Sequence, residues 1–169
     1  DGSDKTTFIH VSDPQSQSAQ QYATFSKVIE TAYEMYDEAG FIVNTGDCVD
    51  HGDNFKQWKW FLDGASETLM NTVMMPASGN HEEKGSNATV TNFTFSNVPE
   101  QDTETGIYYS FDYNNVHVAV LNTNDLNDDE MISDEQLEWF IDDMQSSDAD
   151  WKIVTFHKAI YSNGSHYKD

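Results

Sequence analysis

The sequence has almost no cysteine, few basic residues and no long apolar run. A single cysteine, Cys48, excludes a disulfide within the chain and with it a small fold held together by disulfides. Eight lysines and no arginine stand against thirty acidic residues, and a net charge of −22 excludes nucleic acid as a bulk ligand. No run reaches the roughly 18 apolar residues that a transmembrane helix needs, so no membrane span is expected.

The first residues, 1–7, have neither the basic start nor the apolar stretch of a signal peptide. Removal of a signal peptide would leave such a polar start. A strongly acidic composition with many Asn, Ser and Thr also fits an exported protein. We therefore expect a location outside the cell or in the cell envelope.

The composition is that of a folded domain despite the charge. Hydrophobic residues make up 37% of the 169 residues and aromatics 13%, which is enough for a core. We expect a single domain over residues 1–169. Because the negative charge would repel a phosphate ester, phosphate chemistry on this chain would need cations at the site.

Hydrophobic periodicity predicts strands that alternate with helices. Apolar runs predict strands at 6–12, 41–45, 72–76 and 151–156, and a hairpin at 107–113 and 116–122. Helical spacing predicts helices at about 17–39 and 55–69, and a third after a capping box that starts at Ser133. The third helix would bury a stripe formed by Leu137, Phe140, Ile141 and Met144. The polar stretch 83–105 reads as a long loop, of a length that is typical of functional or mobile loops.

Strands alternating with helices are typical of an α/β fold with a largely parallel sheet, whose ligands gather beyond the carboxyl ends of the strands. Four polar residues follow four predicted strands: Asp13, Asp47, Asn80 and His157. Carboxylate, amide and imidazole groups suit Fe, Mn, Zn or Mg rather than a soft copper site. A carboxylate shared between two ions would let them activate a water and clamp a phosphoryl group.

The motifs that contain these residues resemble those of the calcineurin-like metallophosphoesterase family, with purple acid phosphatases as the nearest group. The family pattern is D-x-H, G-D-x-x-D, G-N-H-E, a lone H and a final G-H-x-H. The chain has Asp13-Pro14-Gln15, Gly46-Asp47-Cys48-Val49-Asp50, Gly79-Asn80-His81-Glu82 and His157. The resemblance implies a layered α/β/β/α sandwich and a metal-dependent phosphoric ester hydrolase, in which metal-bound hydroxide attacks phosphorus in a phosphorylated small molecule.

The resemblance also assigns roles. Asp13 would bind the first of two divalent or trivalent ions, Asp47 would bridge both, and Asn80 with His157 would bind the second. His81 would face the substrate and protonate the leaving oxygen, with Glu82 orienting it.

The chain departs from the family pattern in two motifs, and some assignments stay open. Gln15 replaces the usual histidine, and Asp50 stands where purple acid phosphatases have a tyrosine. Gln15 and Asp50 are therefore open as metal ligands, and His166 is open as a substrate contact. No G-H-x-H occurs before Asp169, so we expect incomplete C-terminal strands and weak activity of this chain alone. A further C-terminal segment or a second copy would then complete the site.

A non-catalytic function is the alternative. The same fold could serve as an acidic surface module that binds a phosphorylated or carbohydrate ligand without hydrolysing it.

Overall fold

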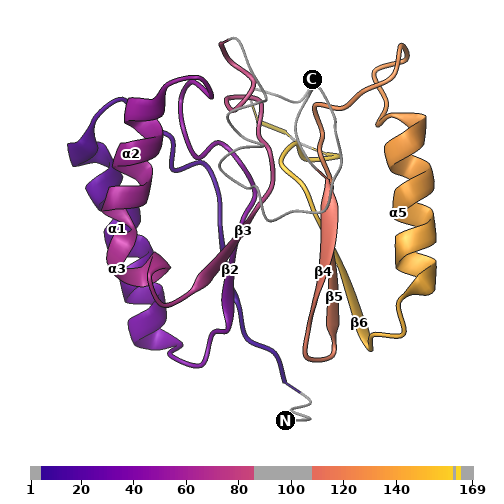
Figure 1. Cartoon of the computed structure of the whole chain (residues 1–169), viewed down its shortest axis with the longest axis horizontal. Coiled ribbons are helices and arrows are strands. Elements are labelled where there is room, and N and C mark those ends of the chain that lie inside the picture. The colour runs from indigo at the N-terminus through magenta and orange to yellow at the C-terminus, as the bar shows by residue number, and fades with distance from the viewer. Residues whose placement is uncertain (1–4, 86–107, 162, 165–169) are drawn as a thin grey trace.

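The computed structural model describes residues 5–85, 108–161 and 163–164. Figure 1 shows four layers: the helices α1, α2 and α3, a first sheet, a second sheet, and the helix α5. This is the expected α/β/β/α sandwich. Over the residues described, no helix is both long and apolar enough to cross a membrane.

The first sheet contains three parallel strands in the order β1 (Ile9–Val11), β2 (Phe41–Asn44) and β3 (Val73–Pro76). All four residues of β2 are buried, as expected for the central strand of a parallel sheet that is covered on both faces. Parallel pairing brings the carboxyl ends of the three strands to the same edge. The loops that leave this edge carry the first three predicted motifs.

The outer face of the first sheet is covered by α1 (Ala19–Met35), α2 (Phe55–Gly64) and α3 (Ser66–Leu69). The predicted helix at 17–39 ends early at Met35, and the predicted helix at 55–69 is divided at Ala65. Asn54 caps α2 by accepting hydrogen bonds from two backbone N–H groups of its first turn. The core beneath these helices is aromatic and includes Tyr22, Phe25, Trp58 and Phe61.

The second sheet consists of β4 (Tyr109–Tyr113), β5 (Val116–Val120) and β6 (Trp151–Thr155). The first two strands form the expected antiparallel hairpin, and Asn114 in its turn has a φ of 52°. The third strand pairs parallel to β5 after a crossover through α5 (Asp134–Ser146). The carboxyl ends of β5 and β6 therefore lie at the same end of this sheet.

The two sheets pack face to face through apolar side chains. The ring of Phe41 in β2 contacts those of Phe111 and Tyr113 in β4, with centroids 5.3 and 5.1 Å apart. Val118 and Val120 of β5 are fully buried in the same interface. Each such side chain contributes on the order of 1.5–3 kcal/mol by leaving water, so this core holds the two layers together.

The predicted apolar stripe of α5 is partly wrong. Leu137 and Ile141 are 46% and 44% exposed, and the buried residue of the helix is Gln136. The capping box is half formed, since Ser133 accepts a hydrogen bond from the Gln136 backbone while the Gln136 side chain bonds elsewhere. Phe140 and Met144 of the predicted stripe are half-buried, so α5 faces the sheet with polar and apolar groups together.

Candidate metal centre

The four residues predicted at strand ends converge, although they come from two sheets instead of one. Asp13, Asp47 and Asn80 follow β1, β2 and β3, whereas His157 follows β6 of the second sheet. The His157 Nε2 atom lies 3.1 Å from Asn80 Oδ1 and 3.5 Å from Asp47 Oδ1. Asp13, Asp47 and His157 each offer a ligand atom, and these atoms lie within 4.8 Å of one another.

Two of these residues have an unusual backbone. Asp13 and Asp47 have φ angles of 56° and 54°, in the left-handed region that costs a non-glycine residue about 1–3 kcal/mol at such sites. Backbone hydrogen bonds hold them there, from Asp13 N to Gly46 O (3.1 Å) and from Gln15 N to Asp47 O (2.9 Å). Strain kept in place by surrounding bonds is typical of functional sites.

Glycines allow the second and third motif loops to touch. Gly46 has a φ of 103°, and a Cβ atom there would lie 2.6 Å from the backbone nitrogen of Gly79. A Cβ atom on Gly79 would lie 2.2 Å from Asp47 Oδ1. Both motifs therefore need glycine before the polar residue, because a side chain would separate the loops.

Glu82 organises the backbone of both loops. Its buried carboxylate accepts hydrogen bonds from the N–H groups of Asp47 (2.7 Å), Gly79 (2.8 Å) and Val49 (3.2 Å). It therefore acts on the loops and not, as the sequence suggested, on the imidazole of His81. Burial raises the pKa of Glu82 above its usual value, although the N–H groups of Gly79 and Val49 oppose the shift. Burial likewise raises the pKa of neighbouring Glu83 to about 7.

Both ring nitrogens of His157 face acceptor groups. The Nδ1 atom lies 2.8 Å from the carbonyl oxygen of Thr45, which can only accept, so Nδ1 carries a proton. The Nε2 atom lies 3.1 Å from Asn80 Oδ1 and 3.5 Å from Asp47 Oδ1, and it can donate to these oxygens as an imidazolium or, in the neutral ring, share a cation with them. The Thr45 contact fixes the ring in the orientation that a metal ligand needs.

Gln15 contacts Asp47 through its amide. The Nε2 group donates to Asp47 Oδ2 at 3.1 Å. The Oε1 atom is buried and has no hydrogen-bond partner within the described part of the chain. An unsatisfied amide oxygen beside a carboxylate cluster is compatible with a nearby ion or water.

His81 stands between two carboxylates. Its backbone N–H donates to Asp47 Oδ1 at 2.9 Å, and its ring Nε2 lies 3.8 Å from Asp47 Oδ2. The other ring nitrogen, Nδ1, lies 3.0 Å from both the carbonyl oxygen and the Oδ1 atom of Asp50. Both of these atoms can accept a hydrogen bond from Nδ1, while the Lys84 ammonium, which can only donate, lies 2.9 Å from the same nitrogen.

Asp50 therefore lies beyond His81, on the side away from Asp47. It also accepts a hydrogen bond from Gln17 (3.2 Å) and contacts His51 (3.3 Å). Burial raises the pKa of Asp50, but the Gln17 hydrogen bond and the nearby His51, His81 and Lys84 outweigh this effect and hold it below its ordinary value. Asp50 is placed to orient His81.

The sequence reasoning missed two residues beside the motifs. Lys84 Nζ lies 2.9 and 2.7 Å from the two ring nitrogens of His81, and Asn124 donates from Nδ2 to the carbonyl of Gly79 at 3.0 Å. A lysine three residues after His81 was a usable signal in such an acidic chain, whereas nothing local distinguishes Asn124. His166 lies outside the described residues, and Cys48 is buried.

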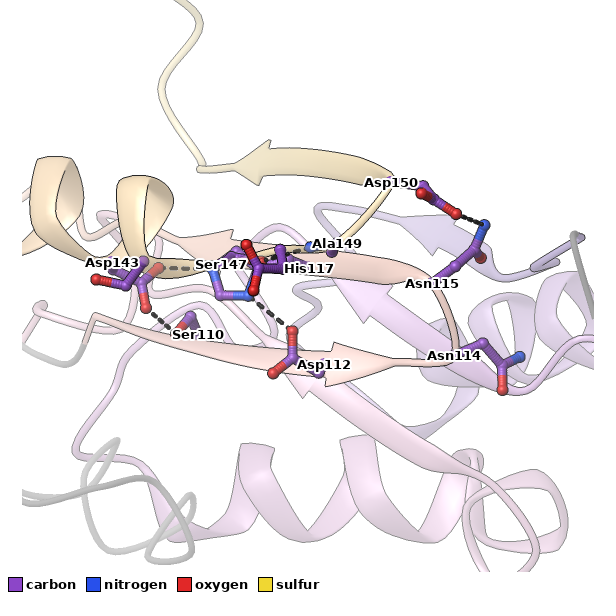
Figure 2. A pocket seen from close by; sticks show the side chains of 11 residues that line it. Ser110, Asp112, Asn114, Asn115, His117, Asp143, Ser147, Ala149 and Asp150 are labelled. Atoms are coloured by element: carbon purple, nitrogen blue, oxygen red, sulfur yellow. Dashed lines mark hydrogen bonds and ion pairs between the residues drawn. The ribbon is translucent and has the colours of Figure 1, made fainter. Parts of the chain in front are cut away.

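Hollows open at several places between the described residues. One of about 450 Å³ borders Asp13 and Gln15 and extends along α1. A larger one of about 610 Å³ lies elsewhere, between β4, β5 and the end of α5. Figure 2 shows His117 in this second hollow between Asp112 and Asp143. None of its lining residues belongs to the converging metal ligands.

Comparisons with known proteins agree with this geometry. The family described as calcineurin-like phosphoesterase matches residues 6–169. Among solved structures, purple acid phosphatase PPD1 from yellow lupin (Lupinus luteus) seeds is similar, with a TM-score of 0.71 and 16% sequence identity. The match covers 96% of this chain and 32% of that one, so the chain spans about a third of its length. Comparison with curated proteins found no match. The motif order, the layered fold and the family match together show that the chain belongs to the calcineurin-like phosphoesterase family.

Proposed function

We propose that the protein is a metal-dependent phosphoric ester hydrolase with a two-ion centre. The observation that carries this proposal is the convergence of Asp13, Asp47 and His157, whose ligand atoms lie within 4.8 Å of one another, with Asn80 Oδ1 3.1 Å from His157 Nε2. A bound cation would offset the negative charge of the two carboxylates. Membership of the family and the likeness to a purple acid phosphatase support the same reaction class.

The chain's own residues divide the work of holding the ions. Asp47 would be shared, with Asp13 as a further ligand of one ion and Asn80 and His157 as further ligands of the other. Gln15 holds the Oδ2 atom of Asp47 through its amide N–H. Two ions bound there would activate water and neutralise the charge of the phosphoryl group.

His81 is the residue placed to handle a proton. Asp50 Oδ1 lies 3.0 Å from its Nδ1, and its Nε2 lies 3.8 Å from Asp47 Oδ2. In the imidazolium form, Nε2–H would pass its proton to the leaving oxygen of the ester, and the ring would become neutral. The ammonium of Lys84 lies beside this ring and can offer positive charge to a phosphoryl oxygen. A phosphorylated small molecule is the substrate class that this arrangement fits.

The experiment measures release of p-nitrophenol from mono- and diester substrates in the presence of Mn²⁺, Fe³⁺ or Zn²⁺. Asp47→Asn should lower the rate on the order of 100-fold, because the shared carboxylate loses its charge. The matched control is Asp63→Asn, which changes an exposed carboxylate that pairs with Lys59. Equal rates for the chain with and without Asp47 would exclude the proposal.

The binding alternative has a different signature. If the wild-type chain binds a metal ion and inorganic phosphate but releases no p-nitrophenol, the fold serves as a binding module. Calorimetry with Mn²⁺, followed by phosphate, separates these outcomes.

A further inference from the structure

We propose that Asn124, held by Gln136 of α5, is a positioning residue for the loop that carries Asn80 and His81. Neither residue belongs to a motif, and both lie on segments attached to the second sheet. The inference rests on the proposed function, because it assigns Asn124 a task in presenting a metal ligand. Its first test, however, does not require metal.

Asn124 acts on the peptide that directly precedes Asn80. Its Nδ2 group donates to Gly79 O at 3.0 Å, while the N–H of Gly79 donates to Glu82 Oε2 at 2.8 Å. Gly79 is thus held at both ends, once from the second sheet and once from within its own loop. The contact with Asn124 fixes the plane of the peptide that links Gly79 to Asn80.

Asn124 is in turn fixed by a buried amide network. Its backbone N–H donates to Asn122 Oδ1 at 3.0 Å. Gln136 bonds both backbone groups of Asn122, accepting from N at 2.8 Å and donating to O at 3.0 Å. Gln136 and Asn122 are each 0% exposed. The Gln136 amide also donates to Asp125 Oδ2 at 3.1 Å, so all parts of its side chain are paired.

The chemistry of the network favours positioning over simple burial. The one buried residue of α5 is Gln136, although a leucine at this position would remove more apolar area from water. A glutamine that pairs both an N–H and a C=O sets the direction of the loop, and an apolar residue would leave these groups unpaired at a cost. The network therefore connects α5 to the metal loop through three hydrogen-bonded steps: Gln136 to Asn122, Asn122 to Asn124, and Asn124 to Gly79.

The test uses Asn124→Asp and Asn124→Ala in the full chain. Aspartate places a carboxylate against the Gly79 carbonyl, and alanine only removes the donor. Asn127→Ala is the matched control, because Asn127 lies in the same loop and bonds the backbone of Asp129 and Met131. The first readout is hydrogen–deuterium exchange of residues 76–82 in the metal-free chain, and the second is Mn²⁺ affinity by calorimetry.

We expect exchange at residues 76–82 to rise roughly fivefold in Asn124→Ala, the factor for one lost hydrogen bond, and further in Asn124→Asp. Mn²⁺ affinity should fall on the order of tenfold in Asn124→Asp. Asn127→Ala should change neither quantity. Unchanged exchange at 76–82, or an equal rise throughout the chain, would overturn the positioning role. If exchange rises locally but the wild-type chain binds no Mn²⁺, the positioning contact stands and the proposed function fails.

Discussion

At the scale of single residues, Asp47 is the centre of the site. Its buried carboxylate receives hydrogen bonds from Gln15 and from the His81 backbone, and it lies 3.5 Å from the Nε2 atom of His157. Its backbone N–H is held by Glu82. A buried negative charge beside other carboxylates is costly unless a cation compensates it. Loss of charge at Asp47 should therefore affect the site more than loss of charge at any other residue.

Lys84 gives a prediction about substrate charge. Lys84→Ala should raise KM about tenfold for a phosphate monoester, because a charged hydrogen bond to the phosphoryl group is lost. The effect should be smaller for a diester, which carries less charge. Steady-state kinetics with both substrates measure the difference.

Two variants control for this effect. Lys84→Arg keeps the charge and should retain most of the affinity, and Lys59→Ala removes an exposed lysine that pairs with Asp63. A fall in kcat without a change in KM would argue that Lys84 serves His81 instead of the substrate.

The sequence predicted the motif residues well because their order carries the information. Asp13, Asp47, Asn80 and His157 lie together in the structure, while their role as metal ligands stays a prediction. Contacts that depend on tertiary packing were not predictable. Asn124 reaches Gly79 across 45 residues of sequence, and no local pattern marks such a pair.

At the scale of secondary structure elements, α5 is held by polar contacts. The His117 ring of β5 bonds Asp112 of β4 and Asp143 of α5, each at 2.8 Å (Figure 2). Ser110 also bonds Asp143. On the other side, Lys152 of β6 is the register partner of His117, and its ammonium donates to the Met144 carbonyl. With an acceptor at each ring nitrogen, the arrangement favours the doubly protonated imidazolium.

This arrangement predicts a pH dependence of stability. Burial lowers the pKa of His117, but the hydrogen bonds with Asp143 and Asp112 outweigh it and raise the pKa above its ordinary value. A raised histidine pKa gives stability that is complete below about pH 6.5 and is lost as the pH rises through the folded-state pKa. His117→Gln should remove on the order of 1 kcal/mol at pH 6 and less at pH 8.5.

Chemical denaturation of the wild type and of His117→Gln across this pH range provides the measurement. His51→Gln is the control, since His51 is exposed and lies on another loop. A constant difference between wild type and His117→Gln at all pH values would contradict the protonated state of His117.

The same polar face explains why part of the α5 prediction failed. Leu137 and Ile141 satisfy helical periodicity, and the sequence therefore placed them inward. The sheet beneath the helix presents Ser110, Asp112 and His117. Helix α5 instead turns Asp143 toward Ser110 and His117, and Gln136 toward the backbone of Asn122, because unpaired polar groups under a helix would cost more than exposed leucine and isoleucine.

At the scale of the whole molecule, the net charge of −22 opposes the compact state. Sodium chloride at 0.5 M should therefore raise Tm by roughly 2–4 °C, since it screens repulsion among exposed carboxylates. Thermal unfolding followed by circular dichroism, in buffer with a chelator to remove divalent ions, measures this shift. Potassium chloride should act equally. A fall in Tm with either salt would show that local ion pairs outweigh the overall repulsion.

The layered architecture could be predicted only through the family resemblance. Alternating strands and helices indicated one largely parallel sheet, and periodicity carries no information on where one sheet ends and another begins. The hairpin of β4 and β5 starts a separate sheet, which packs on the first through residues such as Phe111. That packing brings the loop after β6 opposite the loops after β1, β2 and β3.

His157 thus belongs to one half of the sandwich and its neighbours Asp47 and Asn80 to the other. If one half slid against the other, the distances between the metal-ligand atoms of His157, Asp47 and Asn80 would change before the internal structure of either half was disturbed. The affinity for an ion would then depend on how the two halves are aligned. A bound ion would in turn stabilise that alignment.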